Sequence, residues 1–222
     1  MNQLLKVEFH CHTIYSKDSP NRLPDLLAAA RRKGIDRLVI TDHNRICGAV
    51  LAQQLDPELV IVGEEIMTRK GELLAAYVTE EVPAHLPPEE AIARLRAQGA
   101  FISVSHPFDR QRAGWDLVDL QAIMPLVDAV EVFNARCTRA VLNEQAQAFA
   151  REHNLAGTVG SDAHSLLEVG RATLRLPAFA GPDELRAVIR QGTPDVILSA
   201  PAVHLTSVYA RLVKRMFPRL CP

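Results

Sequence analysis

The chain has 222 residues, of which 48% are hydrophobic and 23% charged, a composition that predicts a globular protein and excludes an intrinsically disordered one. Its length suits a single domain over residues 1–222 better than two domains. A formal net charge of −1 provides no overall positive field for holding a polyanion, which argues against non-specific nucleic-acid binding but leaves a nucleotide substrate open.

Short β-rich runs alternate with helical stretches along the chain. In the first half we expect strands at residues 5–12, 37–41, 59–63, 73–78 and 100–105, with helices at 24–33 and 88–98. In the second half we expect strands at 129–133, 155–160, 173–176 and 196–198, with helices at 139–153, 183–191 and 207–217. The last of these helices is basic and amphipathic, and we expect it to pack on the body of the domain. The alternation predicts a parallel α/β fold, either a barrel or an open sheet.

Side chains of the kinds that bind metals gather at the ends of these predicted strands. They are His10, His12, Asp42, His43, Glu64, Glu65, His106, Glu131, Asn134, Asp162 and His164. In barrels and parallel sheets the carboxyl ends of the strands meet at one edge, where active sites lie. Histidines without a shared role would be scattered over helix faces and loops, so this placement predicts a metal site at that edge.

Two pairs of residues have the spacing of metal ligands. His10 and His12 stand two apart on a strand, so both imidazoles face the same way and reach one cation. Asp162 and His164 repeat this spacing near the other end of the chain. Two such pairs at strand ends favour a metal centre over a chance pair of surface histidines.

Other candidate metal ligands each have an alternative interpretation. Asp18 lies in a polar loop and belongs to the site only if that loop folds back over the first strand. Asp42 either orients a neighbouring histidine or caps the next helix. Of Glu64 and Glu65, one should point into the site and bridge two cations. His85 is a loop histidine that is an alternative ligand.

Four residues near strand ends or in loops are candidates for binding a phosphate group. They are Arg45, Arg110, Asn134 and Arg136, and a solvated side chain is the alternative for each arginine. The segment 109–115 contains two arginines and the only tryptophan of the chain, and it is a candidate lid over the site.

The four cysteines are widely spread and form no CxxC pair, so we expect free thiols in a reducing compartment. They are Cys11, Cys47, Cys137 and Cys221. The N-terminus has no apolar signal region, and no stretch approaches the roughly 20 apolar residues of a membrane span. We therefore expect a cytoplasmic protein without a membrane partner.

The motifs FHCHTIYSKD, ITDHN, VGEEI, SVSHPFD, DAVEVFNAR and GSDAHS resemble, in this order, those of the PHP (polymerase and histidinol phosphatase) family. The resemblance covers about residues 7–176. It implies a distorted (β/α)7 barrel that binds two or three divalent cations at the carboxyl ends of its strands, commonly Zn, Mn or Fe, with Mg as an alternative.

The resemblance also implies a set of ligands. The first metal would be bound by His10, His12, Glu65 and Asp162; the second would share Glu65 and take His106; the third would use Asp18, His43 and His164. Many members of the family have a further histidine in a GExH-like segment after the glutamate turn. This chain has GELL at residues 71–74, so the second metal would bind weakly, complete its shell with water or recruit His85.

We expect a metal-dependent phosphoesterase that hydrolyses a small phosphomonoester or phosphodiester by means of a metal-bound hydroxide. Alternatives within the same chemistry are a nucleotide phosphatase or exonuclease and a histidinol phosphatase. A basic groove near the metals would favour the nucleotide or nucleic-acid substrates. An alternative of another class is a non-catalytic metal-binding module.

Overall fold

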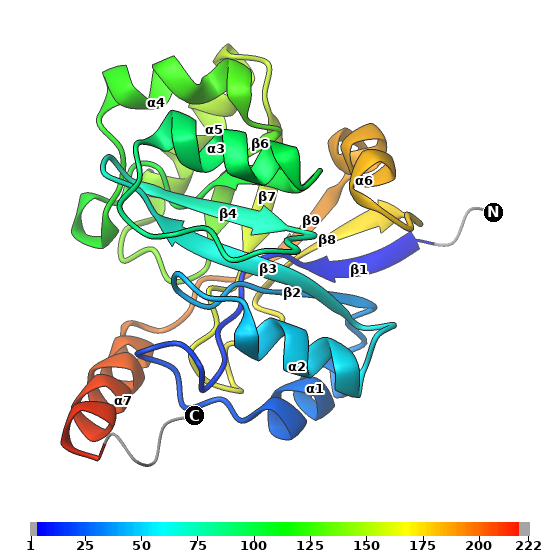
Figure 1. The fold of residues 1–222 in the computed structure, drawn as a ribbon, viewed down its shortest axis with the longest axis vertical. Helices are drawn as coiled ribbons and strands as arrows, with labels where there is room; N and C mark the ends of the chain where they lie inside the picture. Colours follow the sequence, from blue (N-terminus) through cyan, green and yellow to red (C-terminus); the bar gives the residue numbers. More distant parts are fainter. Residues whose placement is uncertain (1–3, 218–222) are drawn as a thin grey trace.

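The computed structural model describes residues 4–217, which form one mixed sheet with helices on its outside (Figure 1). The strands are β1 Leu4–Glu8, β2 Arg37–Ile40, β3 Val60–Met67, β4 Glu72–Ala76, β5 Phe101–Val104, β6 Ala129–Asn134, β7 Ala156–Gly160, β8 Ala172–Pro177 and β9 Thr193–Val196. The helices are α1 Leu23–Arg32, α2 Cys47–Leu55, α3 Pro88–Ala97, α4 Leu117–Ile123, α5 Ala140–Glu152, α6 Pro182–Val188 and α7 His204–Met216.

The sheet curves until its ends almost meet. The strand order is β7-β6-β5-β4-β3-β2-β1-β8-β9. A parallel bridge joins Cys11, just after β1, to Ala163, just after β7, and the amide of His12 donates to the carbonyl of Ala163 over 3.0 Å. The strands β1 to β7 therefore form a nearly closed barrel, and the predicted barrel is confirmed in outline, with β8 and β9 extending the sheet beside β1.

The barrel departs from the regular alternation of parallel strands and helices. β1, β2 and β3 are parallel to one another, as are β5, β6 and β7, but β4 runs antiparallel to both β3 and β5. β3 and β4 are joined as a hairpin rather than by a helix. Because β4 is reversed, its first residue lies at the rim where its neighbours end. The strands β8 and β9 are also antiparallel to their partners.

The strands β2 to β5 are buried on both faces, which explains their largely apolar sequences. Along β2, Leu38 and Ile40 pack with residues such as Leu26 of α1, whereas Val39 belongs to a second cluster with Phe101. Helices α1 and α2 cover one side of the barrel and α3, α4 and α5 the other (Figure 1). The sequence analysis did not predict α2 and α4.

Cys11, Cys47 and Cys137 are free thiols, as expected, and Cys221 lies outside the described residues. Among residues 4–217, no helix combines the length and the apolar character needed to cross a bilayer.

Candidate metal centre

His10 and His12 follow directly after β1, and both side chains are fully buried. Their Nε2 atoms lie 3.1 Å apart, so both rings face one point, as the spacing predicts. Nδ1 of His10 lies 2.9 Å from Oε1 of Glu131, a carboxylate–histidine pair that fixes the ring with Nε2 toward the centre. Gly160 of β7 makes this approach available, because a Cβ at that position would collide with the side chains of His10 and Glu131.

Glu65 of β3 stands at the middle of the site. Its Oε2 lies 3.3 Å from Nε2 of both His10 and His12. The same oxygen is 3.0 Å from Nδ1 of His43, and the other oxygen, Oε1, is 3.2 Å from Nε2 of His106. Side chains alternate along a strand, so Glu64 points the other way and accepts the amide hydrogen of Val82 over 3.0 Å. Glu65 is thus the inward glutamate of the pair.

The loop after β1 folds back as the assignment of Asp18 requires. The hydroxyl of Ser19 and the amide of Asn21 both donate to the carbonyl of His12, each over 3.0 Å. This loop geometry places Oδ1 of Asp18 3.3 Å from Nε2 of His164. Its Oδ2 lies 3.6 Å from Nε2 of His43.

Asp162 and His164 reach the site from the segment after β7. Asp162 has a left-handed backbone with a φ of 53°, a conformation that aspartate adopts more readily than most residues. Its Oδ1 lies 3.2 Å from Nε2 of His12 and 3.3 Å from Nδ1 of His164. The pair converges because of this turn and the bridge at Ala163, not because it continues a strand.

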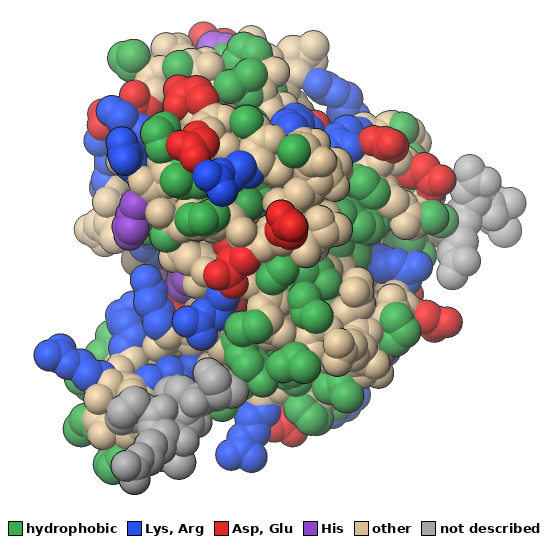
Figure 2. Space-filling model, viewed as in Figure 1, with side chains coloured by type: hydrophobic (Ala, Val, Ile, Leu, Met, Phe, Trp, Pro, Cys, Tyr) green, Lys and Arg blue, Asp and Glu red, His purple; other side chains and the backbone are tan. Residues whose placement is uncertain are grey.

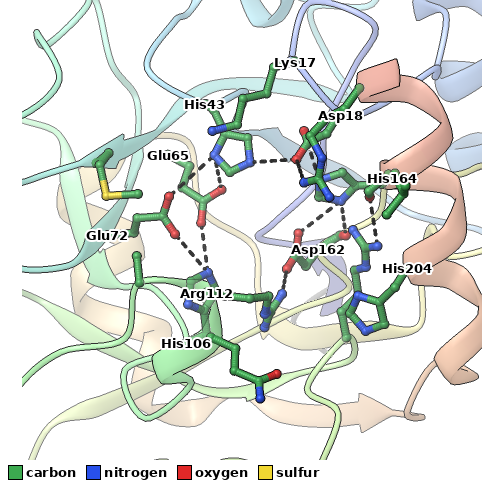
Figure 3. Close-up of a pocket in the computed structure, with 17 residues that line it drawn as sticks. Lys17, Asp18, His43, Glu65, Glu72, His106, Arg112, Asp162, His164 and His204 are labelled. Carbon is green, nitrogen blue, oxygen red and sulfur yellow. Dashed lines mark hydrogen bonds and ion pairs between the residues drawn. The ribbon is translucent and has the colours of Figure 1, made fainter. Parts of the chain in front are cut away.

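Glu72 is a buried carboxylate of the site that the sequence analysis did not assign (Figure 3). It is the first residue of β4, with Oε2 3.3 Å from Nε2 of His106 and Oε1 3.7 Å from Nδ1 of His43. The sequence analysis treated this segment as lacking a ligand because it holds no histidine. The signal available in the sequence was the glutamate itself, directly before an apolar run.

The buried donor atoms fit divalent cations. Three groups of residues each bring their ligand atoms within 4.8 Å of one another: His10, His12 and Asp162; His43, Glu65 and Glu72; and His12, His43 and His164. Imidazole nitrogens and carboxylate oxygens in such mixtures suit Zn, Mn or Fe better than Ca. The groups overlap, so the residues present are compatible with more than one cation.

The pKa values of the ligands reflect this crowding. Burial, together with the charge of His164, lowers the pKa of His12 to about 3, which keeps its imidazole neutral, as metal ligation requires. Burial and the neighbouring Glu65 carboxylate raise the pKa of Glu72 to about 7. Burial raises the pKa of Glu65, but the charges of His10 and His43 outweigh it and hold that pKa well below its usual range. A cation between Glu65 and Glu72 would relieve their repulsion.

Several residues that the sequence analysis considered for the site lie outside the metal cluster. The exposed His85 is not among the residues that line the cavity, so the structure does not bring it to the cluster. Arg110 is exposed and pairs with Asp116 over 2.8 Å. Arg45 lines a neighbouring cavity. Asp42 neither caps a helix nor orients a histidine, because its Oδ1 accepts the amide hydrogen of Thr13 over 2.6 Å.

Arg112, rather than Arg110, is the arginine of the 109–115 loop that faces the cavity. It forms ion pairs with Asp109, over 3.0 Å, and with Asp162. The loop is anchored by Trp115, whose indole N–H donates to the carbonyl of Glu72 over 3.1 Å. A side chain at Gly71 would collide with this indole, so the β3–β4 turn and the loop fit together only with glycine there.

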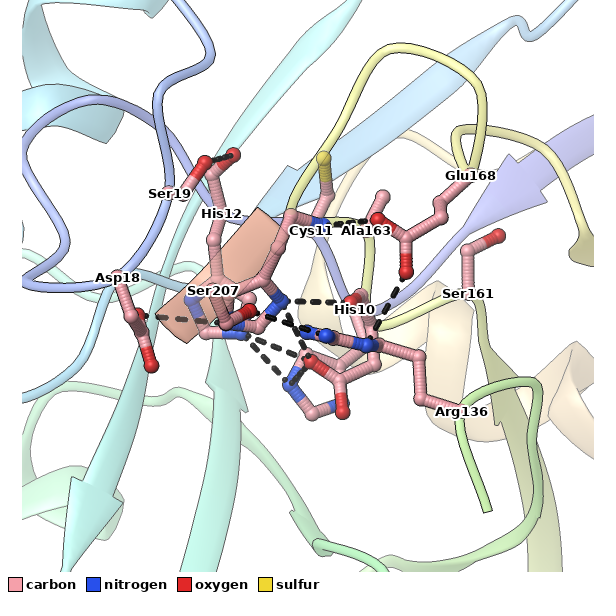
Figure 4. A network of polar contacts seen from close by, with 12 residues as sticks. His10, Cys11, His12, Asp18, Ser19, Arg136, Ser161, Ala163, Glu168 and Ser207 are labelled. Atoms are coloured by element: carbon pink, nitrogen blue, oxygen red, sulfur yellow. Dashed lines mark hydrogen bonds and ion pairs between the residues drawn. The ribbon is translucent and has the colours of Figure 1, made fainter. Parts of the chain in front are cut away.

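Arg136 is buried and joins the ligand loop to α7 (Figure 4). Its guanidinium pairs with Glu168 over 3.1 Å and donates to the hydroxyl of Ser207 over 3.0 Å. Glu168 in turn accepts the amide hydrogen of His164 over 3.2 Å. These contacts hold α7 across the cavity, where His204 and Ser207 form part of the wall.

Asn134 is also buried, and its amide donates to Glu131 over 3.0 Å and to Asp162 over 3.2 Å. These contacts place it among the groups that orient ligands. The sequence assigned no role to His204, because only the packing of α7 brings it to the site.

Comparison with known proteins shows the family to which the sequence is similar. Residues 8–76 match the sequence model of the PHP domain, and residues 141–194 match that of the PHP-associated family. An uncharacterized protein of Methanocaldococcus jannaschii is 37% identical over 187 residues, which make up 82% of this chain and 75% of that protein.

Solved structures share the fold at low sequence identity. PsfC from Pseudomonas syringae has a TM-score of 0.71 and 18% identity, with 96% of this chain and 100% of that chain covered. A protein of Bifidobacterium adolescentis provisionally assigned as a metal-dependent phosphoesterase has a TM-score of 0.58 and 18% identity. The match covers 72% of this chain and 87% of that chain. Endonuclease Q of Pyrococcus furiosus has a TM-score of 0.65 and 16% identity, covering 90% of this chain but only 60% of its own.

Proposed function

The chain belongs to the PHP family, and from that premise we propose that it is a metal-dependent phosphoesterase that hydrolyses a small phosphomonoester or phosphodiester. The family and the site together support a metal-dependent hydrolase. The observation that carries the proposal is the position of Glu65, whose two oxygens contact four histidines from three segments of the chain.

The cavity beside the cluster has a volume of about 390 Å³, which suits a small substrate. Bound divalent cations would supply an acidified water molecule and neutralise phosphate oxygens. The residues of this chain would hold those cations, exclude bulk water and orient the phosphate. Arg112 is the cation of the 109–115 loop on the cavity wall, so we assign it to the phosphate.

Replacing Arg112 by glutamine should raise KM or lower kcat/KM about tenfold, since a charge-assisted hydrogen bond to phosphate is lost. Arg110→Gln is the matched control, because Arg110 is exposed and pairs with Asp116 outside the cavity. Steady-state kinetics on one phosphomonoester, with metal content measured in parallel, tests the assignment. Equal kcat/KM values for the two variants would contradict it.

Protein purified without chelator should contain at least one transition metal per chain by elemental analysis, because the donor groups are buried and preassembled. The same protein should release phosphate in a screen of sugar phosphates, nucleotides and phosphodiesters with Mn, Zn or Mg added. A folded protein that takes up no metal would instead favour the non-catalytic module. A metal-loaded protein inactive on every phosphoester would point to another hydrolytic substrate.

A further inference from the structure

A second cavity, of about 550 Å³, opens beside the metal site, and its lining within residues 4–217 holds several cations and no carboxylate. Its charged residues are Lys17, Arg45, Arg211, Lys214 and Arg215. They come from the loop after β1, the loop after β2 and helix α7. On the face drawn in Figure 2, Lys and Arg side chains gather beside α7. This concentration of positive charge is local, because the whole chain has a formal net charge of −1.

The excess of positive charge is a feature of this cavity and not of the surface in general. Another cavity of the molecule, near β1 and α6, is lined by both signs of charge, with Arg31 and Arg37 beside Asp36, Glu58 and Glu184. In the cationic cavity Arg211 contacts Asp18 over 3.5 Å. Within residues 4–217, no carboxylate forms an ion pair with the side chain of Lys17, Arg45 or Arg215. Gathered like charges repel one another, and a bound anion would relieve that repulsion.

The cationic cavity is continuous with the metal site and is held together by contacts of its own. Lys17, His43 and Arg211 line both cavities. The ammonium group of Lys214 donates to the carbonyls of Ile14 and Ser16, which joins α7 to the loop after β1. Helix α7, which contributes Arg211, Lys214 and Arg215, lies beyond both regions that match the family models, whereas Lys17 and Arg45 lie within the first of them.

We propose that the cationic cavity binds a second phosphate group of the substrate, so that the enzyme prefers compounds with two phosphates over matched compounds with one. This inference rests on the proposed function, since the first phosphate would occupy the metal site. The second phosphate group could belong to a small bisphosphate or to the backbone of a short oligonucleotide. Two pairs of test compounds distinguish these two kinds of substrate.

The first test compares kcat/KM for fructose 1,6-bisphosphate with fructose 6-phosphate, and for a 5′-phosphorylated thymidine dinucleotide with the mononucleotide. We expect the compound with two phosphates to be preferred about tenfold in at least one pair. Arg45→Gln/Arg215→Gln should reduce that preference to near unity. Arg94→Gln/Arg151→Gln removes the same charge from exposed helix surfaces and should keep it. No preference in either pair, or a preference that survives in Arg45→Gln/Arg215→Gln, would overturn the proposal.

A binding measurement separates failure of the cavity from failure of the proposed function. Inorganic pyrophosphate is titrated by calorimetry into protein freed of metal with a chelator and then desalted, at low salt, where exposed charges are least screened. We expect the Kd for pyrophosphate to be about tenfold higher in Arg45→Gln/Arg215→Gln than in the wild type and the control variant. If no phosphoester is hydrolysed but this difference holds, only the proposed function fails. Equal Kd values, or no detectable binding to the wild type, would contradict the proposal that this cavity binds a second phosphate.

Discussion

His10→Ala/His12→Ala should abolish hydrolysis, with kcat/KM falling by at least about a thousandfold if cations supply the nucleophile. The two Nε2 atoms lie 3.1 Å apart, and each is 3.3 Å from the central Glu65. His12 belongs to two of the three groups of donor atoms, so its loss weakens two positions at once. Elemental analysis of the variant should show a loss of at least one metal per chain.

The fold should survive this double substitution, because both histidines lie after the end of β1, at the rim of the barrel. Circular dichroism and thermal unfolding would establish that the variant is folded before its activity is compared. His153→Ala is a suitable control, since His153 lies at the end of α5 and does not line the cavity. Turnover in the double variant equal to that of the control would refute the ligand assignment.

The expectation that ligands follow strand ends works where the strands are parallel. β1, β2 and β3 run in the same direction, so His10, His43 and Glu65 come to one rim. His106 joins them after β5, because β5 also ends at that rim. Spacing on individual strands therefore predicts much of the cluster without any knowledge of long-range contacts.

The residues that the sequence analysis missed depend on how segments pack. Nothing in the local pattern of residues 72–76 shows that β4 is reversed, so the start of that strand was not considered as a rim position. Arg110 and Arg112 share one short helical turn, and only contacts with Asp109 and Asp162 select Arg112. His204 reaches the cavity because Arg136 and Glu168 hold α7 there, over a large separation in sequence.

The second metal position that the family resemblance implies would have more ligands than the absence of a histidine suggests, because Glu72 lies beside His106. Its Oε2 is 3.3 Å from Nε2 of His106, and it shares a group of donor atoms with Glu65 and His43. Mg²⁺ and Mn²⁺ favour carboxylate ligands more than Zn²⁺ does. A carboxylate beside His106 should therefore shift metal preference at this position toward Mn or Mg.

Glu72→Gln should lower metal content by about one ion per chain and turnover by about a hundredfold, since a ligand charge is removed while side-chain size is kept. Glu72→His should restore much of the occupancy but shift the preference toward Zn, because imidazole suits Zn well.

Two variants serve as controls for Glu72→Gln. Burial raises the pKa of Glu64 to about 8, so Glu64→Gln replaces a largely protonated neighbour that points away from the site. His85→Ala removes an exposed histidine outside the cavity. Anomalous scattering at the metal edges would locate any missing ion beside His106. Full occupancy there in Glu72→Gln, or its loss in His85→Ala, would show that Glu72 is not the ligand that completes this position.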